Sequence, residues 1–342
     1  MSLTQFRNLL LEYRLPLVCV ILVLILVPIV FFQLAVINTK NTPINIQVAR
    51  PMDVPNKTQN LKIGYSGANL NLPKKISAYH QELTTAKLDQ ISHYAKLLSI
   101  EGEPKQFSPG SNAFIWKNST ALLTFSPTIQ KLEIKKFNVK SGQNNDNGLA
   151  EQQINNLLVK LGININTTLD KTPKIENFKE MILNPEKGKA ENADFLQLTY
   201  TQSIDGLPVI SQNPDNYSIR GRFVFGEIQN LELDLGIQNA PIKGKEHKTV
   251  NFQKIVKTLE AGGGTFISAL NPEENTDYAT QAKTAVSIDL NNAQVAYYQN
   301  LSEKIDLIPV LIFSGTLKFT DQKTRNVRII APLLSSYVFT QP

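Results

Sequence analysis

The sequence of 342 residues has few of the side chains that redox and metal chemistry require. It contains one cysteine, Cys19, so an intramolecular disulfide or a cysteine-based zinc site is excluded. Three histidines, His80, His93 and His247, leave little room for a histidine-rich metal site, and no H-E-x-x-H or EF-hand pattern is present. We therefore expect no metal ligands and no cofactor.

Recognisable catalytic motifs are also missing. There is no G-x-S-x-G elbow, and no S-x-x-K motif accompanied by K-T-G. Gly262-Gly263-Gly264 follows a predicted helix, whereas a phosphate-binding loop leads from a strand into a helix. We expect no catalytic and no cofactor-binding residues, so the protein is predicted not to be an enzyme. A hydrolase with an unfamiliar arrangement stays open as a third hypothesis.

The charge balance is moderately basic. Lysine and arginine number 35 against 29 aspartates and glutamates, a formal net charge of +6. An excess this small, which we take to be spread along the chain, argues against a dedicated nucleic-acid-binding protein. Lys74-Lys75 and Lys135-Lys136 are short basic pairs, either solvated or in contact with an anionic lipid or polymer.

The longest apolar run predicts a membrane anchor. Leu15–Ile37 carries no charge and one strongly polar side chain, Gln33, and about 20 apolar residues span a bilayer as a helix. A cleaved signal peptide is the alternative, but its apolar region would be shorter and followed by a small-x-small site. We expect an uncleaved signal-anchor in a cell membrane, with residues 1–14 as a cytoplasmic head and the large C-terminal part outside the cytoplasm.

The remainder predicts an α+β fold built from repeated helix-plus-antiparallel-sheet units. Apolar residues recur at helical spacing in three places, each followed by strand-like segments: about Thr84–Leu98, Leu149–Leu161 and Phe252–Ala261. Thr84 and Asn251 are candidate N-caps, and Gly162 fits a helix end. Gln238–Thr249, with three lysines, is predicted to be a polar linker. The expected organisation is a stalk at 38–71 and units at 72–141, 148–237 and 248–342.

A sequence echo supports duplication of these units. Gln197–Ser203 is followed by Leu207–Ile210, and Gln294–Asn300 is followed by Ile308–Leu311, with Gln, Tyr, Gln and Pro-Val in the same order. We therefore expect Pro208 and Pro309 to occupy equivalent positions in superposable hairpins.

This pattern resembles PepSY-like modules and the extracytoplasmic regulatory domains of the YycH and YycI type. Ile204-Asp205-Gly206-Leu207-Pro208-Val209 is similar to their Asp-Gly hairpin, and the likeness covers about residues 149–330. Phe225-Gly226-Glu227 stands where those domains have an Asp-x-x-Gly turn. The resemblance implies a bacterial, non-catalytic, single-pass protein that restrains a membrane partner such as a sensor kinase, or inhibits a peptidase.

We accordingly expect a non-catalytic, membrane-anchored extracytoplasmic protein that binds and regulates a membrane or envelope partner. The expected partners are the lipid bilayer and a protein, with no nucleic acid and no small-molecule substrate. Candidate partner contacts are Gln33, Tyr297 and Tyr298; the two tyrosines are successive in a predicted strand, so one should face outward. The alternative is a structural component of a cell-envelope, secretion or pilus assembly.

Overall fold

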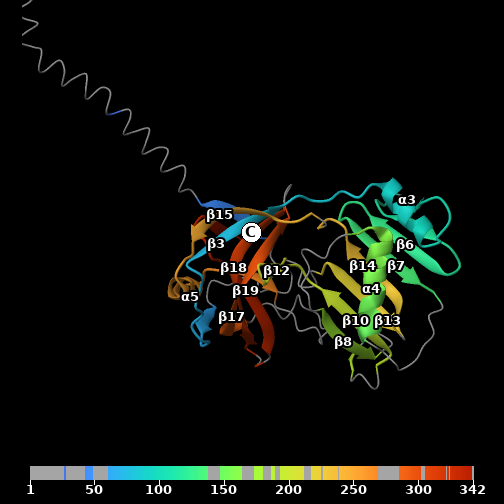
Figure 1. Cartoon of the computed structure of the whole chain (residues 1–342). Helices are drawn as coiled ribbons and strands as arrows, with labels where there is room; N and C mark the ends of the chain where they lie inside the picture. The colour runs from blue at the N-terminus through green and yellow to red at the C-terminus, as the bar shows by residue number, and fades with distance from the viewer. Residues whose placement is uncertain are drawn as a thin grey trace, which may run out of the picture. The chain divides into compact units, whose positions relative to one another are not determined.

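Strands dominate the described chain. The computed structural model describes residues 27, 43–48, 61–108, 110–137, 147–163, 173–179, 186–188, 193–211, 217–224, 226–237, 239–268, 285–301, 305–320, 322 and 324–340. Within these residues there are twenty strands, labelled β1 to β20, and three helices, labelled α3 to α5 (Figure 1). The expected α+β fold of repeated units is therefore wrong, because the described structure is mostly β.

The three helices lie where hydrophobic periodicity places them. They are α3 (Leu88–Leu97), α4 (Asn147–Leu161) and α5 (Phe252–Glu260). Asn251 caps α5 by accepting a hydrogen bond from the backbone N–H of Gln253, and Gly162 after α4 has a φ of 66°, as predicted. Thr84 does not cap α3; its backbone N–H instead donates to the carbonyl of Gly236 at 2.9 Å.

The expectation of a single-pass membrane protein is corrected by the structure. No helix among the described residues is long and apolar enough to cross a membrane. Of the predicted head and span, 1–37, only Val27 is described, so Gln33 lies outside the described residues. We therefore do not retain the membrane anchor, the bilayer as a partner or the extracytoplasmic placement.

The chain divides into two compact units. The first comprises residues 1–46 and 335–338, and the second comprises 47–334 and 339–342. Strand β1 (Ile44–Gln47) pairs with β20 (Tyr337–Thr340) in a two-stranded sheet. Both β1 and β2 (Lys62–Tyr65) form within residues 38–71, where the sequence predicts a stalk.

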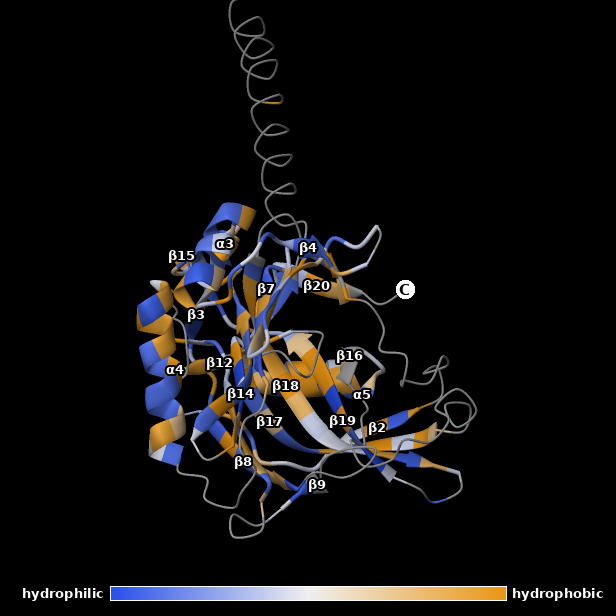
Figure 2. Ribbon diagram, turned by 90° about the vertical axis from the view of Figure 1, so that its right-hand side faces the viewer, coloured by the Kyte–Doolittle hydropathy of each residue, from blue (hydrophilic) through white to orange (hydrophobic). Residues whose placement is uncertain are grey.

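Within the second unit, one sheet of nine strands, here called sheet I, carries α3 and α4. Its order is β4-β5-β6-β7-β14-β13-β10-β8-β9. The bounds are β4 Lys105–Gln106, β5 Phe114–Lys117, β6 Ala121–Ser126, β7 Lys131–Lys136, β8 Lys174–Lys179, β9 Glu186–Lys187, β10 Phe195–Tyr200, β13 Ile219–Val224 and β14 Glu227–Asp234. Successive side chains of a strand point to opposite faces of the sheet, so the buried side chains mark the face that belongs to the core. On β14 these are Leu231 and Leu233. On α4 they are Ile154 and Leu158, which belong to the apolar stripe of that helix visible in Figure 2.

A second sheet, here called sheet II, is built on two long strands. Its main order is β11-β12-β17-β18-β19-β16; in addition β2 pairs with β17, and β3 pairs with β18 and β15. The bounds are β3 Lys75–Gln81, β11 Ser203–Ile204, β12 Leu207–Ile210, β15 Ile242–Lys248, β16 Thr265–Ser268, β17 Ala285–Leu301, β18 Ile305–Phe319 and β19 Thr324–Pro332. The ring of Phe252 of α5 packs on Phe313 of β18, with centroids 6.1 Å apart.

The predicted duplication does not survive the strand pairing. In β18, Pro309 pairs with Tyr297 of the strand that precedes it. In β12, by contrast, Pro208 pairs with Ser203 of the short β11, and β12 then runs parallel to β17. The cause is a tight turn soon after β10, where Asp205 and Gly206 have φ values of 52° and 75°. The two segments therefore differ in topology.

The side chain of Gln81, the last residue of β3, holds two segments that connect the two sheets. Its Nε2 donates to the carbonyls of Ile237 at 3.1 Å and Asn239 at 2.7 Å, and its Oε1 accepts from Nε2 of Gln202 at 3.0 Å. Gln81 is 1% exposed and Gln202 is 4% exposed. Because buried amides without partners are costly, these bonds tie the paths of both segments to the end of β3. We call Gln81, Gln202 and the two carbonyls the glutamine clasp.

We predict that Gln81→Ala lowers the free energy of unfolding by about 2 to 3 kcal/mol, because it leaves the Gln202 amide and two carbonyls without their partner. Denaturant unfolding followed by circular dichroism measures the change. Gln153→Ala, at an exposed position on α4, is the matched control and should change stability by less than about 0.5 kcal/mol. Equal losses in both variants would contradict the role of the clasp.

Candidate functional site

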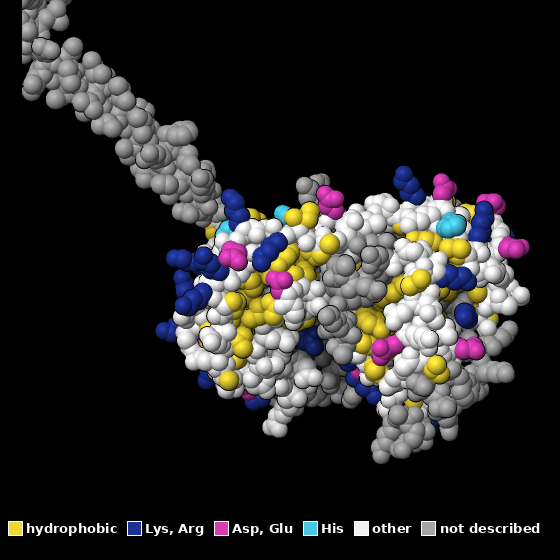
Figure 3. Space-filling model, viewed as in Figure 1, with side chains coloured by type: hydrophobic (Ala, Val, Ile, Leu, Met, Phe, Trp, Pro, Cys, Tyr) yellow, Lys and Arg dark blue, Asp and Glu magenta, His cyan; other side chains and the backbone are white. Residues whose placement is uncertain are grey.

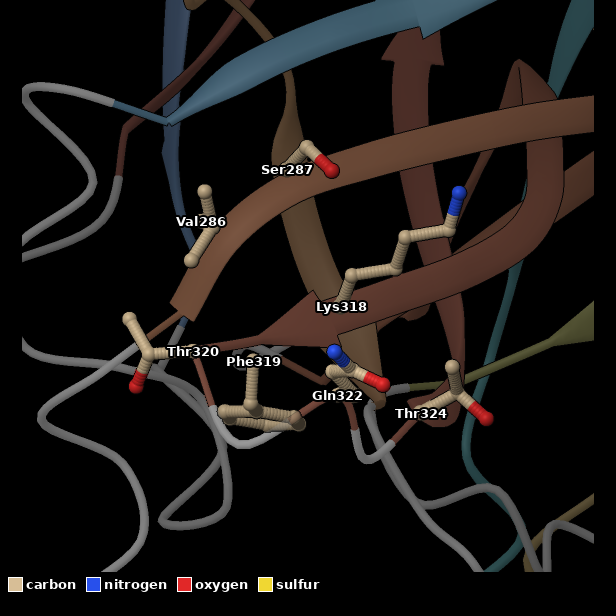
Figure 4. A pocket seen from close by; sticks show the side chains of 7 residues that line it. All are labelled: Val286, Ser287, Lys318, Phe319, Thr320, Gln322 and Thr324. Atoms are coloured by element: carbon tan, nitrogen blue, oxygen red, sulfur yellow. The ribbon is translucent and has the colours of Figure 1, made fainter.

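A pocket of about 500 Å³ lies at the end of the long strands of sheet II (Figure 4). Its lining residues are Val286, Ser287, Lys318, Phe319, Thr320, Gln322 and Thr324. Lys318 is the one ionisable side chain among these seven, and it forms an ion pair with Asp289. The lining thus offers hydroxyl and amide groups around one lysine. Ser287 stands opposite Lys318 in the pairing of β17 with β18, and the ammonium of Lys318 is engaged by Asp289.

The two tyrosines predicted to contact a partner are both in the interior. Tyr297 is 1% exposed and Tyr298 is 3% exposed, so the expectation that one faces outward is wrong. Tyr297 packs edge-on against Tyr79, with ring centroids 5.4 Å apart, and Tyr298 packs on Phe339 at 5.5 Å. Both faces of this part of β17 are therefore covered, and burial raises the pKa of the Tyr298 hydroxyl to about 12.

The hydroxyl of Tyr79 is anchored to the turn between β11 and β12. It donates to Oδ2 of Asp205 at 2.5 Å. Burial, followed by the hydrogen bond and negative charge of Asp205, raises the pKa of Tyr79 to about 12. Tyr79 therefore stays protonated at neutral pH and acts as a donor that holds the turn against sheet II.

A charged network occupies the face of sheet I opposite the helices. Glu232 of β14 is 8% exposed and accepts hydrogen bonds from Tyr217 and Lys131, and from Arg220 at 2.8 Å. Burial alone would raise the pKa of Glu232, but these donors outweigh it and hold that pKa below its ordinary value. The guanidinium of Arg220 also lies 4.1 Å from the Tyr217 ring centroid. Since the members satisfy one another, we interpret the network as structural.

The pKa of Asp234, two residues further along β14, is shifted in the opposite direction to that of Glu232. Burial raises its pKa from 3.8 to about 6, although the backbone N–H of Gly236 donates to its Oδ1 at 2.8 Å. The folded protein therefore binds the Asp234 proton more tightly than the unfolded chain does. This contribution to stability is complete below about pH 4 and is lost as the pH rises through about 6.

The excess of positive charge lies in two segments of the chain. The segments 61–81 and 239–261 contain eight lysines and two glutamates, which equals the +6 of the whole chain, so the remaining sequence is balanced. Pairing of β3 with β15 joins these segments, with Lys75 opposite Lys248. All eight lysines are exposed. Charge that we took to be spread along the chain is therefore concentrated in the fold.

We define the basic surface as seven of these lysines, on or next to β3, β15 and α5: Lys74, Lys75, Lys243, Lys245, Lys248, Lys254 and Lys257. Figure 3 shows lysine and arginine side chains gathered over β15 and α5. This surface was not predicted from the sequence, because Gln238–Thr249 was expected to be a polar linker. The alternating lysines within Ile242–Lys248 were the one sign of a strand in this segment. The segment lacks the alternating apolar residues by which a half-buried strand is usually recognised.

The chain was compared with known proteins. No protein-family model matches it, and no curated protein matches it. Among solved structures, it is similar to that of an uncharacterized protein from Eubacterium rectale, with a TM-score of 0.47 and 10% sequence identity, over 83% of this chain and 92% of that one.

We predict that Asp234→Asn stabilises the protein by on the order of 2 kcal/mol at pH 7 and leaves it unchanged at pH 4, since the amide keeps an acceptor for Gly236 without the cost of burying a charge. Urea unfolding at pH 4, 5, 6 and 7 measures this. Glu227→Gln, at an exposed position on the same strand, is the control. A gain of the same size at every pH would show that titration of Asp234 is not its cause.

Proposed function

We propose that this chain is a non-catalytic binding protein that holds an acidic partner protein on its basic surface. The concentration of seven lysines against two glutamates on or next to β3, β15 and α5 carries the proposal. Only Glu246 and Glu260 offset the lysines in the two segments concerned. A positively charged surface patch attracts acidic partners, speeds their association and disfavours basic partners.

The lysines have properties suited to contact with a partner. All seven lysine side chains of the basic surface are exposed to solvent. A partner can therefore reach their charges without any buried ion pair being broken. Exposed charges are screened by salt over about 8 Å at physiological ionic strength. Binding through this surface should therefore weaken as salt rises.

The chemistry elsewhere fits a binding role. The carboxylate of Glu232 is engaged by three donors, Asp205 holds Tyr79, and Lys318 in the pocket of Figure 4 pairs with Asp289. Each of these charged groups thus has a structural partner. The resemblance of residues 149–330 to PepSY-like and YycH/YycI-type regulatory domains implies the same kind of role, which is restraint of a partner protein.

We predict that crosslinking in the native host followed by mass spectrometry yields one dominant acidic partner, and that the variant Lys243→Glu/Lys245→Glu/Lys248→Glu loses it, because reversed charges repel an acidic surface. The matched control reverses three exposed lysines of sheet I: Lys105→Glu/Lys135→Glu/Lys136→Glu. The control should retain the partner.

Three other outcomes would contradict the proposal. Equal capture by both triple variants would place the contact elsewhere. A diffuse set of envelope proteins without a stoichiometric partner would favour the structural-assembly alternative. Labelling of the purified protein by activity-based probes, above a heat-denatured control, would contradict the absence of catalysis.

A further inference from the structure

We propose that the acidic partner contributes an extended segment that pairs as an additional strand with the outer edge of β15; this inference rests on the proposed function. Strand β15 pairs with β3 along one edge, and no strand among the described residues pairs with its other edge. Six of its seven residues are exposed, the exception being the half-buried Gly244. An exposed strand edge is a template for a further strand.

The direction of the backbone groups can be followed from the residues just after β15. The N–H of Thr249 donates to the carbonyl of Lys74, on the β3 side, at 3.3 Å. The N–H of Val250 donates to the carbonyl of Leu333, on the other side, at 2.8 Å. Since backbone groups alternate in direction along a strand, those of Lys248 and Glu246 face the same side as those of Val250. The isolated bridge between Thr249 and Leu334 occupies this side just beyond β15. The outward backbone groups of Lys248 and Glu246 precede that bridge, at positions where no strand among the described residues pairs with them.

A β-bulge limits how long the added strand can pair. The register with β3 shifts between Lys243 and Glu246. Gly244 sits in this bulge, where a Cβ atom would lie 2.9 Å from the carbonyl oxygen of Ala78. The bulge divides the edge into two short runs, Ile242–Lys243 and Glu246–Lys248. Backbone bonds over runs this short bind weakly, so the side chains must supply the rest of the affinity.

The lysines decide which strand can add. A second copy of β15 would place lysines beside lysines, and like charges across a strand pair are destabilising. A strand rich in glutamate or aspartate would place carboxylates beside Lys243, Lys245 and Lys248 instead. The chemistry of the edge therefore selects an acidic, extended peptide and opposes self-association.

The test uses a nine-residue peptide of alternating glutamate and valine, and the same peptide N-methylated at every residue. Both carry the same charge, but the methylated form has no backbone donors. We expect the methylated peptide to bind the full chain at least about tenfold more weakly by isothermal titration calorimetry. Hydrogen exchange on the wild-type protein should show slower exchange at the amides of Glu246 and Lys248 when the unmethylated peptide is bound.

Two variants at one position separate charge from backbone pairing. Lys248→Gln removes the charge and keeps the outward N–H, whereas Lys248→Pro removes both, and proline is tolerated where a strand edge faces solvent. We expect Lys248→Pro to bind the unmethylated peptide about tenfold more weakly than Lys248→Gln does, with both variants showing the same unfolding midpoint within about 3 °C.

The failures of the two proposals are distinguishable. Equal binding of both peptides, abolished by reversing Lys243, Lys245 and Lys248, would leave the basic surface as the site and overturn strand addition. Absence of binding by either peptide would overturn both proposals. Dimerisation of the wild-type chain that Lys248→Pro abolishes would identify the occupant as a second copy and overturn the acidic peptide.

Discussion

The glutamine clasp is the constraint on which the arrangement of the described sheets depends. Gln81 ends β3, and its carboxamide binds the segment that leads from β14 to β15 and the segment that leads from β10 to β11. The carbonyl of Asn239, which it holds at 2.7 Å, lies three residues before β15 begins. One buried amide therefore sets where β15 starts beside β3. The exposed edge is positioned by an interior interaction, as a binding surface on a rigid support requires.

The apolar interior explains why β15 can be so polar. The long strands β17 and β18 pair over most of their length, and residues such as Leu290, Val310 and Phe313 are fully buried. Burial of this apolar surface supplies the main driving force for folding. Strand β15 adds little to it, because its side chains are exposed. Its residues are therefore constrained by solubility and recognition, and lysine serves both on a strand edge.

Local features of this fold could be predicted from the sequence, and non-local ones could not. Helical periodicity located α3, α4 and α5, and Asn251 was identified as a cap, because these depend on residues within one or two turns. The pairing of β7 with β14, about 100 residues apart in the sequence, leaves no local signal. Tyr297 and Tyr298 show the same limit: alternation indicates opposite faces, but Tyr79 and Phe339 cover both. The linker assigned to Gln238–Thr249 failed because a strand exposed on both faces has no hydrophobic period.

Two kinds of recognition meet on the basic surface, and each compensates for what the other lacks. Backbone hydrogen bonds at a strand edge are nearly independent of sequence, so alone they would accept any extended chain, including another copy of β15. Lysine charges alone would attract any polyanion without fixing its conformation. When Lys243, Lys245 and Lys248 stand on the edge itself, the peptide must be both extended and acidic. Because β3 brings Lys75 opposite Lys248, the fold adds charge from a distant segment to the same surface. Specificity then arises from the coincidence of two weak requirements, and neither needs a deep pocket.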